Sequence, residues 1–261
     1  MKKIKTVIKY LQHQIKAKNQ HSAHSPFLYN FITQVINQNN KNKHFKSIEK
    51  LRKDLKLSNE FINITDYGAG SSVNNAKRRK ISDIAKYSAK NKKFGELIYR
   101  ISQYFNANVI IELGTSLGIS TLYLALANSQ SIVYTLEGCP ETLKIAERSF
   151  KTKDVKNIIT IEGDFKNTLK PCLQKIKNVD LIFIDGNHQK EPTISYFETF
   201  LQYSNNDTVF IFDDIYWSSG MEKAWKYIIT HKKTTLTIDL FHLGIVFIKK
   251  ELSKENYKIK F

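Results

Sequence analysis

From residue 109 to residue 249, short apolar runs of strand length alternate with amphipathic segments of helical length. The predicted strands are 109–112, 131–137, 158–161, 179–185, 208–213, 235–240 and 245–249. The predicted helices are 119–128, 140–150, 165–176, 191–203 and 221–230. Such alternation is typical of a parallel sheet with helices on its faces. The sequence therefore predicts the α/β class, with a doubly wound, mostly parallel sheet of seven strands.

Two details refine this prediction. Only residues 241–244 separate the last two predicted strands. So short a link permits an antiparallel hairpin and excludes a parallel neighbour, so the sheet is expected to end in a C-terminal antiparallel hairpin strand. Pro171 falls inside the predicted helix 165–176, where it is expected to kink or break the helix.

Residues 1–94 are predicted to form a basic, mainly helical N-terminal region, and residues 95–261 the main domain. Apolar residues recur at helical spacing between residues 4 and 15. Ser25 before Pro26 is a candidate N-cap and first helical residue. Further helices are predicted at 46–57, 81–85 and 94–105.

Positive charge is concentrated in the N-terminal region. The whole chain has a net charge of +17, and residues 1–95, with 21 Lys and Arg against 5 Asp and Glu, hold +16 of it. These basic residues could form a surface that binds phosphate-rich partners, or they could simply face the solvent. We expect that they face the solvent, because no aromatic residues are interleaved with the lysines. The run Lys77–Lys80 is likewise expected to be one solvated helix face, with contact to an acidic substrate group as the alternative.

The remaining composition indicates a soluble cytoplasmic protein. No apolar run approaches the length needed to cross a bilayer. Lys5 and Lys9 interrupt the apolar residues at the start of the chain, so no signal-peptide core is present there. Cys139 and Cys172 show neither metal-ligand nor redox spacing.

Two glycines follow the first predicted strand, at the end of a parallel sheet where ligands bind. Gly114 allows the chain to turn sharply and to approach a ligand closely, and the amides from Thr115 to Ile119 then lie near a helix start. The spacing of Gly114 and Gly118 differs from that of dinucleotide-binding folds, which disfavours a nicotinamide cofactor.

An acidic residue stands at or just beyond the end of each of the first five strands. A carboxylate at Glu137 can accept both hydroxyls of a ribose, and Asp164 or its neighbouring amide can hold an adenine amino group. Each of these residues, taken alone, could instead cap a helix or lie in a solvated turn. The full set is Glu112, Glu137, Asp164, Asp185 and the pair Asp213–Asp214.

These motifs resemble those of class I S-adenosylmethionine-dependent methyltransferases. The segments are VIIELGTSLGIST from Val109, YTLEG ending at Gly138, EGD ending at Asp164, DLIFIDGNH ending at His188, and FDD ending at Asp214. The closest resemblance, over about residues 95–250, is to small-molecule O-methyltransferases of the catechol and caffeoyl-CoA kind and their bacterial relatives. It implies a Rossmann-like sheet whose closing antiparallel strand is a hallmark of the family.

The resemblance also implies a cofactor site. The loop from Glu112 to Gly118 would wrap the methionine part of S-adenosylmethionine, and Glu137 would take the ribose hydroxyls. The residues implied to bind cofactor are Glu112, Gly114, Thr115, Ser116, Gly118, Glu137, Gly138, Asp164, Phe165 and Asp185.

In metal-dependent members of this family, an acidic residue after the fourth strand and a pair after the fifth bind a divalent cation. Asp185, Asp213 and Asp214 match those positions and suit Mg²⁺. His188 stands where the catechol type has a lysine base, so Asp185 and His188 are the catalytic candidates, with His188 as base or as a metal or cofactor contact. The alternative for Asp213–Asp214 is that they cap the helix after residue 217.

Three functions remain open. The first is O-methylation of a small molecule, either neutral or anionic, with or without Mg²⁺, in which the N-terminal helices cover the crevice. The second is RNA methylation, with the basic N-terminal region holding phosphates. The third is a non-catalytic protein that binds S-adenosylmethionine. The glycine-containing stretch Tyr67–Gly70 is expected to be a turn that borders the active site.

Overall fold

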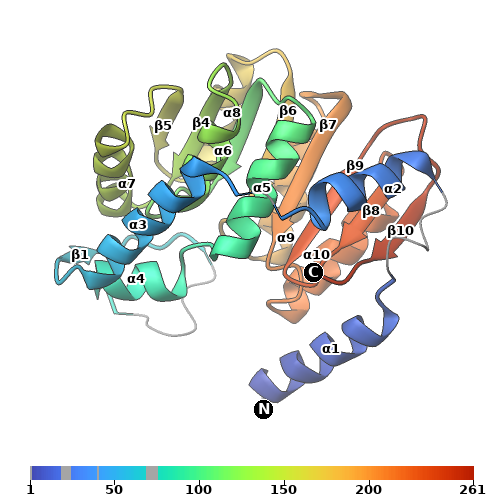
Figure 1. Ribbon diagram of the computed structural model, residues 1–261, viewed down its shortest axis with the longest axis horizontal. Coiled ribbons are helices and arrows are strands. Elements are labelled where there is room, and N and C mark those ends of the chain that lie inside the picture. The colour runs from blue at the N-terminus through green and yellow to red at the C-terminus, as the bar shows by residue number, and fades with distance from the viewer. Residues whose placement is uncertain (1, 19–24, 40, 69–75) are drawn as a thin grey trace. The chain divides into compact units, whose positions relative to one another are not determined.

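The computed structural model describes residues 2–18, 25–39, 41–68 and 76–261 (Figure 1). The chain divides into two compact units. One consists of residues 1–38 together with 180–261, and the other of residues 39–179. The division between an N-terminal region of residues 1–94 and a main domain of residues 95–261 stays a prediction.

The unit of residues 39–179 carries the first three strands of the main sheet. They are β3 (Val109–Leu113), β4 (Ile132–Glu137) and β5 (Ile158–Glu162), in the order β3-β4-β5 with both pairings parallel. The helices of this unit are α3 (Lys43–Leu57), α4 (Ile81–Tyr87), α5 (Lys92–Tyr104), α6 (Ile119–Ala127), α7 (Pro140–Thr152) and α8 (Phe165–Gln174).

An apolar core joins helices α3 to α7 of this unit. It contains Phe45 and Ile48 of α3, Tyr123 of α6 and Phe150 of α7. Tyr123 is fully buried, and its hydroxyl donates to Glu49 Oε1 at 3.0 Å. The N-terminal helices of the unit are thus packed against the helix that follows β3 and are part of the same core.

The other unit carries five strands. They are β6 (Val179–Ile184), whose first residue falls at the division, β7 (Ser204–Asp213), β8 (Leu236–Asp239), β9 (Leu243–Phe247) and β10 (Glu255–Lys258). Their order is β10-β8-β9-β7-β6. The helices are α1 (Lys2–Lys16), α2 (Pro26–Phe31) with a π-helical turn at Ile32–Ile36, α9 (Lys190–Phe200) and α10 (Ser219–Thr230).

The predicted fold class is confirmed, but the main sheet has eight strands and not seven. The additional strand, β10, pairs in parallel with β8, with Glu255 opposite Leu236. It was missed because its four residues, Glu-Asn-Tyr-Lys, contain no apolar run. The predicted closing hairpin is confirmed, since β8 and β9 are antiparallel with Leu236 opposite Phe247.

Two local predictions fail and one is confirmed. Lys77–Lys80 is not a helix face: Arg78–Lys80 forms β2, which pairs antiparallel with β1 (Phe61–Asn63). Helix α8 continues through Pro171, so the predicted break is wrong, while the predicted kink stays a prediction. The start of α2 is as predicted, with Pro26 as its first residue and Ser25 Oγ accepting from the Leu28 amide at 3.2 Å.

The predicted loop at Tyr67–Gly70 extends beyond the described residues, which end at Gly68 and resume at Ala76. None of the helices in the described part of the chain is both long and apolar enough to cross a membrane.

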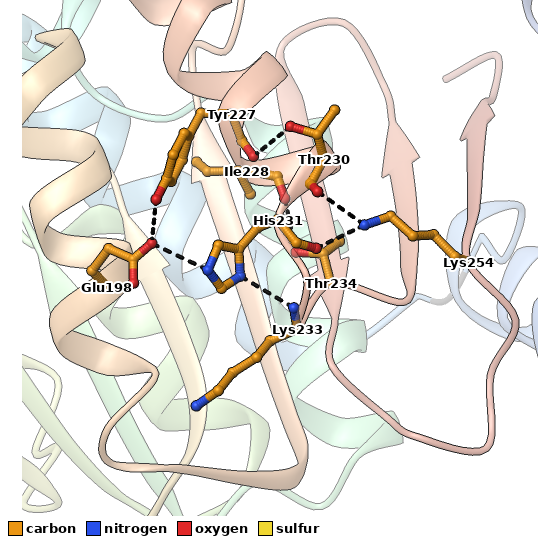
Figure 2. A network of polar contacts seen from close by, with 8 residues as sticks. All are labelled: Glu198, Tyr227, Ile228, Thr230, His231, Lys233, Thr234 and Lys254. Atoms are coloured by element: carbon orange, nitrogen blue, oxygen red, sulfur yellow. Dashed lines mark hydrogen bonds and ion pairs between the residues drawn. The ribbon is translucent and has the colours of Figure 1, made fainter.

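A polar network fixes the end of α10 (Figure 2). Lys254 Nζ donates to the carbonyl oxygens of Thr230 at 3.0 Å and His231 at 2.8 Å, where the helix leaves its last carbonyls without partners. His231 Nδ1 accepts from the Lys233 amide at 3.3 Å, so its proton lies on Nε2, 3.3 Å from Glu198 Oε1. Burial lowers the pKa of His231, which keeps the ring neutral near pH 7.

Candidate active site

The glycine turn after β3 has the backbone shape that its sequence predicts. Gly114 (φ 102°), Ser116 (φ 48°) and Gly118 (φ 78°) all lie in the left-handed region. A Cβ on Gly118 would also lie 2.5 Å from Phe150 Cε1, so no larger residue fits there. Helix α6 starts directly after this turn at Ile119, and the Gly114 amide donates to the Leu136 carbonyl at 2.9 Å. The turn is thereby fixed to the end of β4.

Glu112 lies beneath this turn and is fully buried. Its Oε2 accepts from the hydroxyls of Thr121 and Thr135, the latter at 2.7 Å. Its Oε1 is buried and has no hydrogen-bond partner among the residues that the structure describes. Burial raises the pKa of Glu112 to about 7, against the opposing effect of the hydroxyls of Ser120, Thr121 and Thr135.

Glu137, at the end of β4, is held by the backbone on both sides. Its Oε2 accepts from the Ser116 amide and its Oε1 from the Cys139 amide, each at 2.8 Å. Burial raises its pKa, and these amide bonds oppose the shift. Each carboxylate oxygen has more than one lone pair, so both can still accept from a ligand. The carboxylate is thus oriented by two amides before any ligand binds.

Tyr67, the first residue of the stretch expected to border the active site, lies at the same corner. Its Cδ2 is 2.7 Å from where a Cβ on Gly138 would be, so its ring occupies the space that a side chain at position 138 would take. The ring remains 53% exposed. Tyr67 thus places an aromatic ring against Gly138, the residue that follows Glu137.

The segment that leads to Tyr67 is anchored to the start of α7. The Asn63 amide donates to Glu141 Oε2 at 2.7 Å, and the Thr65 amide donates to Cys139 Sγ at 3.4 Å. The Cys139 thiol in turn donates to the Asn63 carbonyl at 3.5 Å. Residues 138–141 therefore hold both the candidate ribose carboxylate and the segment that carries Tyr67.

Asp164 and Phe165 lie where β5 ends. The Gly163 amide donates to the Glu137 carbonyl at 2.9 Å, which brings the end of β5 beside the Glu137 corner. The Asp164 carboxylate caps α8, because its Oδ1 accepts from the Lys166 amide at 3.0 Å. Phe165 is the first residue of that helix and is partly exposed. An adenine contact at either residue stays a prediction.

A second group of candidate residues lies in the other unit, after β6 and β7. Ligand atoms of Asp185, His188 and Asp213 all lie within 4.8 Å of one another. His188 Nε2 is 3.7 Å from Asp185 Oδ1. Asp213 is 4% exposed and the other two are partly exposed. Two carboxylates and one imidazole so close together form a plausible donor set for a divalent cation.

The loops that carry this group have unusual backbone conformations. Asn187 (φ 70°), His188 (φ 48°) and Asp214 (φ 52°) lie in the left-handed region, which costs free energy for residues other than glycine. Asn187 Nδ2 donates to the Tyr196 hydroxyl at 3.2 Å, which holds the loop onto α9. Strain of this kind is often found at functional sites.

Asp214 does not belong to that three-residue group, so its predicted part as a third ligand stays a prediction. The alternative that Asp213–Asp214 cap the following helix is wrong. Ser218 is the N-cap of α10, with its Oγ accepting from the Met221 amide at 3.1 Å.

Comparison with known proteins shows what this part of the chain is similar to. Residues 111–215 match the family model described as "Methyltransferase domain". A catechol O-methyltransferase from Niastella koreensis is 27% identical over 124 residues, which are 46% of this chain. The match spans 55% of the length of that relative.

Solved structures share the fold over most of their length. An S-adenosylhomocysteine-bound methyltransferase from Podospora anserina has a TM-score of 0.59 at 14% identity, covering 82% of this chain and 92% of that one. An O-methyltransferase from Bacillus cereus, in complex with S-adenosylhomocysteine, has a TM-score of 0.52 at 19% identity, covering 83% and 95%. Residues 111–215 thus match a methyltransferase domain model, and the chain has the same fold as these solved methyltransferases.

Proposed function

We propose that this protein transfers the methyl group of S-adenosylmethionine to an oxygen atom of a small molecule. The observation that carries the proposal is the glycine turn after β3 together with the Glu137 carboxylate at the end of β4. A turn with three left-handed residues leads there into a helix, and Glu137 is held by the amides of Ser116 and Cys139. The similarity to a catechol O-methyltransferase supports oxygen as the acceptor atom.

The residues present fit such a cofactor. The unpartnered Oε1 of Glu112 is an acceptor beneath the turn, suited to an ammonium group or a bound water. Glu137 would accept from the ribose hydroxyls, and the ring of Tyr67 would form an apolar wall beside them. S-adenosylmethionine, when bound, supplies an electrophilic methyl group. The chain's own task is then to orient the two reactants, because in-line displacement depends strongly on alignment.

We further propose that Asp185, His188 and Asp213 hold a divalent cation such as Mg²⁺. The ion, when bound, would lower the pKa of a substrate hydroxyl. If His188 ligates the cation, it is not free to act as the base. If it does not, its near-neutral imidazole can take the hydroxyl proton. A pH profile of activity with and without added Mg²⁺ separates these two roles.

Cofactor binding is tested by thermal unfolding with S-adenosylhomocysteine, with NAD as the control. A ligand at 100 times its Kd stabilises the folded chain by about 2.7 kcal/mol, so a shift of several degrees is expected with S-adenosylhomocysteine alone. Glu137→Ala should abolish the shift, and Glu251→Ala, at an exposed glutamate of the other unit, should keep it. No shift for the wild-type chain would reject the proposal.

Activity is tested with labelled S-adenosylmethionine and a panel of catechols and phenols. The cation site would be supported by methyl transfer that requires Mg²⁺ and is lost in Asp213→Asn. The control is Asp54→Asn, at an exposed residue of α3, which should keep the activity. Activity that withstands both chelation and Asp213→Asn would reject the cation site. Cofactor binding with no transfer to any acceptor would favour the non-catalytic binding protein.

A further inference from the structure

Helix α1 presents its apolar side to solvent, which is the reverse of the usual arrangement in a globular protein. Val7, Ile8, Leu11 and Ile15 are 57%, 49%, 55% and 84% exposed. Their spacing places them on one face of the helix. Four adjacent aliphatic side chains on one helix make a continuous apolar strip, which we call the α1 strip.

The polar side of α1 is the side held by its own unit. His13 is 2% exposed, and its Nε2 lies 3.0 Å from Asp239 Oδ1. Lys9 forms an ion pair with Glu222 of α10. Tyr10 packs edge-on against the ring of Phe241, with the centroids 5.1 Å apart. These contacts fix the rotation of the helix about its axis, so the outward direction of the α1 strip follows from them.

Positive charge accompanies the α1 strip. Residues 1–18 contain six lysines, namely Lys2, Lys3, Lys5, Lys9, Lys16 and Lys18, and no acidic residue. Lys16 and Lys18 are exposed beside the end of the strip. Pairing of α1 with α1 of a second copy would bring two such sets of like charge together, which disfavours a symmetric contact. The charge suits an anionic surface.

We propose that α1 docks on the surface of an anionic lipid bilayer, with the α1 strip inserted at the level of the headgroups and the lysines other than Lys9 paired with lipid phosphates. An exposed aliphatic strip combined with clustered lysines is the pattern of helices that lie in the plane of a membrane interface. This mode needs no membrane-spanning helix, in keeping with the length and hydropathy of α1. The proposal is independent of the chemistry at the ends of β3 and β4.

The test is co-sedimentation of the full chain with vesicles of phosphatidylcholine and phosphatidylglycerol at a ratio of 7:3, against vesicles of phosphatidylcholine alone. We expect binding to the anionic vesicles only, weakened at high salt because lysine–phosphate attraction is screened. Leu11→Ser with Ile15→Ser should reduce the bound fraction at least tenfold without changing the charge. Leu57→Ser with Ile159→Ser, which alters exposed aliphatic residues elsewhere, should bind as the wild-type chain does.

Three other outcomes would each overturn the proposal that α1 docks on a bilayer. Wild-type chain that stays in the supernatant with anionic vesicles shows that no such docking occurs. Equal binding by the Leu11→Ser, Ile15→Ser variant, with its helix content confirmed by circular dichroism, shows that lysines alone hold the chain to the vesicle. A wild-type dimer in light scattering that becomes a monomer in this variant, without vesicle binding, assigns the α1 strip to a second copy.

Discussion

Glu112 shows how a single buried carboxyl group can shape the pH dependence of the whole chain. It is fully buried, and burial raises its pKa from an ordinary value of 4.5 to about 7. The folded chain therefore keeps a proton that the unfolded chain releases between these two pH values. Since stability falls with pH wherever the folded state binds more protons, Glu112 lowers the free energy of unfolding as the pH rises from about 4.5 to about 7.

Glu112→Gln should remove this contribution. We expect the free energy of unfolding of the variant, relative to wild type, to rise between about pH 4.5 and pH 8 by on the order of 3 kcal/mol. Denaturant unfolding at a series of pH values measures it, with the exposed Glu162→Gln as the control. Parallel pH curves for wild type and Glu112→Gln would contradict the prediction.

The contact between Tyr67 and Gly138 gives a second prediction for single residues. If the ring of Tyr67 forms a wall of the nucleoside site, Tyr67→Ala should weaken S-adenosylhomocysteine binding about tenfold, as expected for the loss of one aromatic contact, while Tyr67→Phe should bind nearly as tightly as wild type. Isothermal titration calorimetry measures both. Tyr87→Ala is the matched control, because Tyr87 is also 53% exposed.

Gly138→Ala probes the same contact from the other side. The added Cβ would lie 2.7 Å from the ring of Tyr67, so the variant must displace that ring. A double-mutant cycle of Gly138→Ala with Tyr67→Ala should therefore show non-additive losses in binding. Additive losses would mean that the two residues act independently.

The sequence predicts the residues of the glycine turn and Glu137 because their role depends on local order along the chain: strand, acidic residue, glycine, helix. The sequence predicts only that the stretch Tyr67–Gly70 borders the active site, and not the contact of Tyr67 with Gly138. The position of Tyr67 depends on hydrogen bonds from Asn63 and Thr65 to residues 74 to 78 positions away. The family resemblance implies that His188 and Asp213 lie near one another, and the structure adds that their ligand atoms are within 4.8 Å.

The sequence predicts the strands that contain a run of apolar residues. It does not predict the strands that form only because they pair with a distant segment. Strands β6 and β7 contain the apolar runs VDLIFI and TVFIFD, which read as buried strands at any position in the sheet. Strand β2, Arg-Arg-Lys, exists because it pairs with β1, some 15 residues earlier. A basic strand of three residues has no hydrophobic periodicity, so the sequence of Lys77–Lys80 favours a helix face instead.

The end of α10 offers a test at the scale of one helix. Lys254→Ala removes two charge-assisted hydrogen bonds to the carbonyls of Thr230 and His231, so we expect a loss of about 0.5–1 kcal/mol in the free energy of unfolding. Lys233→Ala is the matched control, because the Lys233 side chain points away from this network and only its amide takes part (Figure 2). Equal losses in the two variants would contradict the assignment.

At the scale of the whole molecule, the charge distribution bears on RNA methylation as an alternative. Residues 1–95 hold a net +16, and Arg78 and Lys80 lie over the ring of Phe61 at 5.1 and 5.4 Å. We expect only weak, non-specific binding of RNA that is present at about 50 mM salt and lost at about 200 mM. A gel shift with total RNA measures it, and a complex that persists at the higher salt would favour an RNA substrate.

The corner formed by residues 137–141 has a consequence for how proteins with this architecture can diverge. Position 138 can hold a larger side chain only if the ring at position 67 moves or is lost, because both claim the same volume. Relatives that keep this segment should therefore pair a small residue at one position with an aromatic at the other, or exchange the two together. Substitutions at these two sites, 71 positions apart along the chain, are thus expected to be accepted in evolution as a pair.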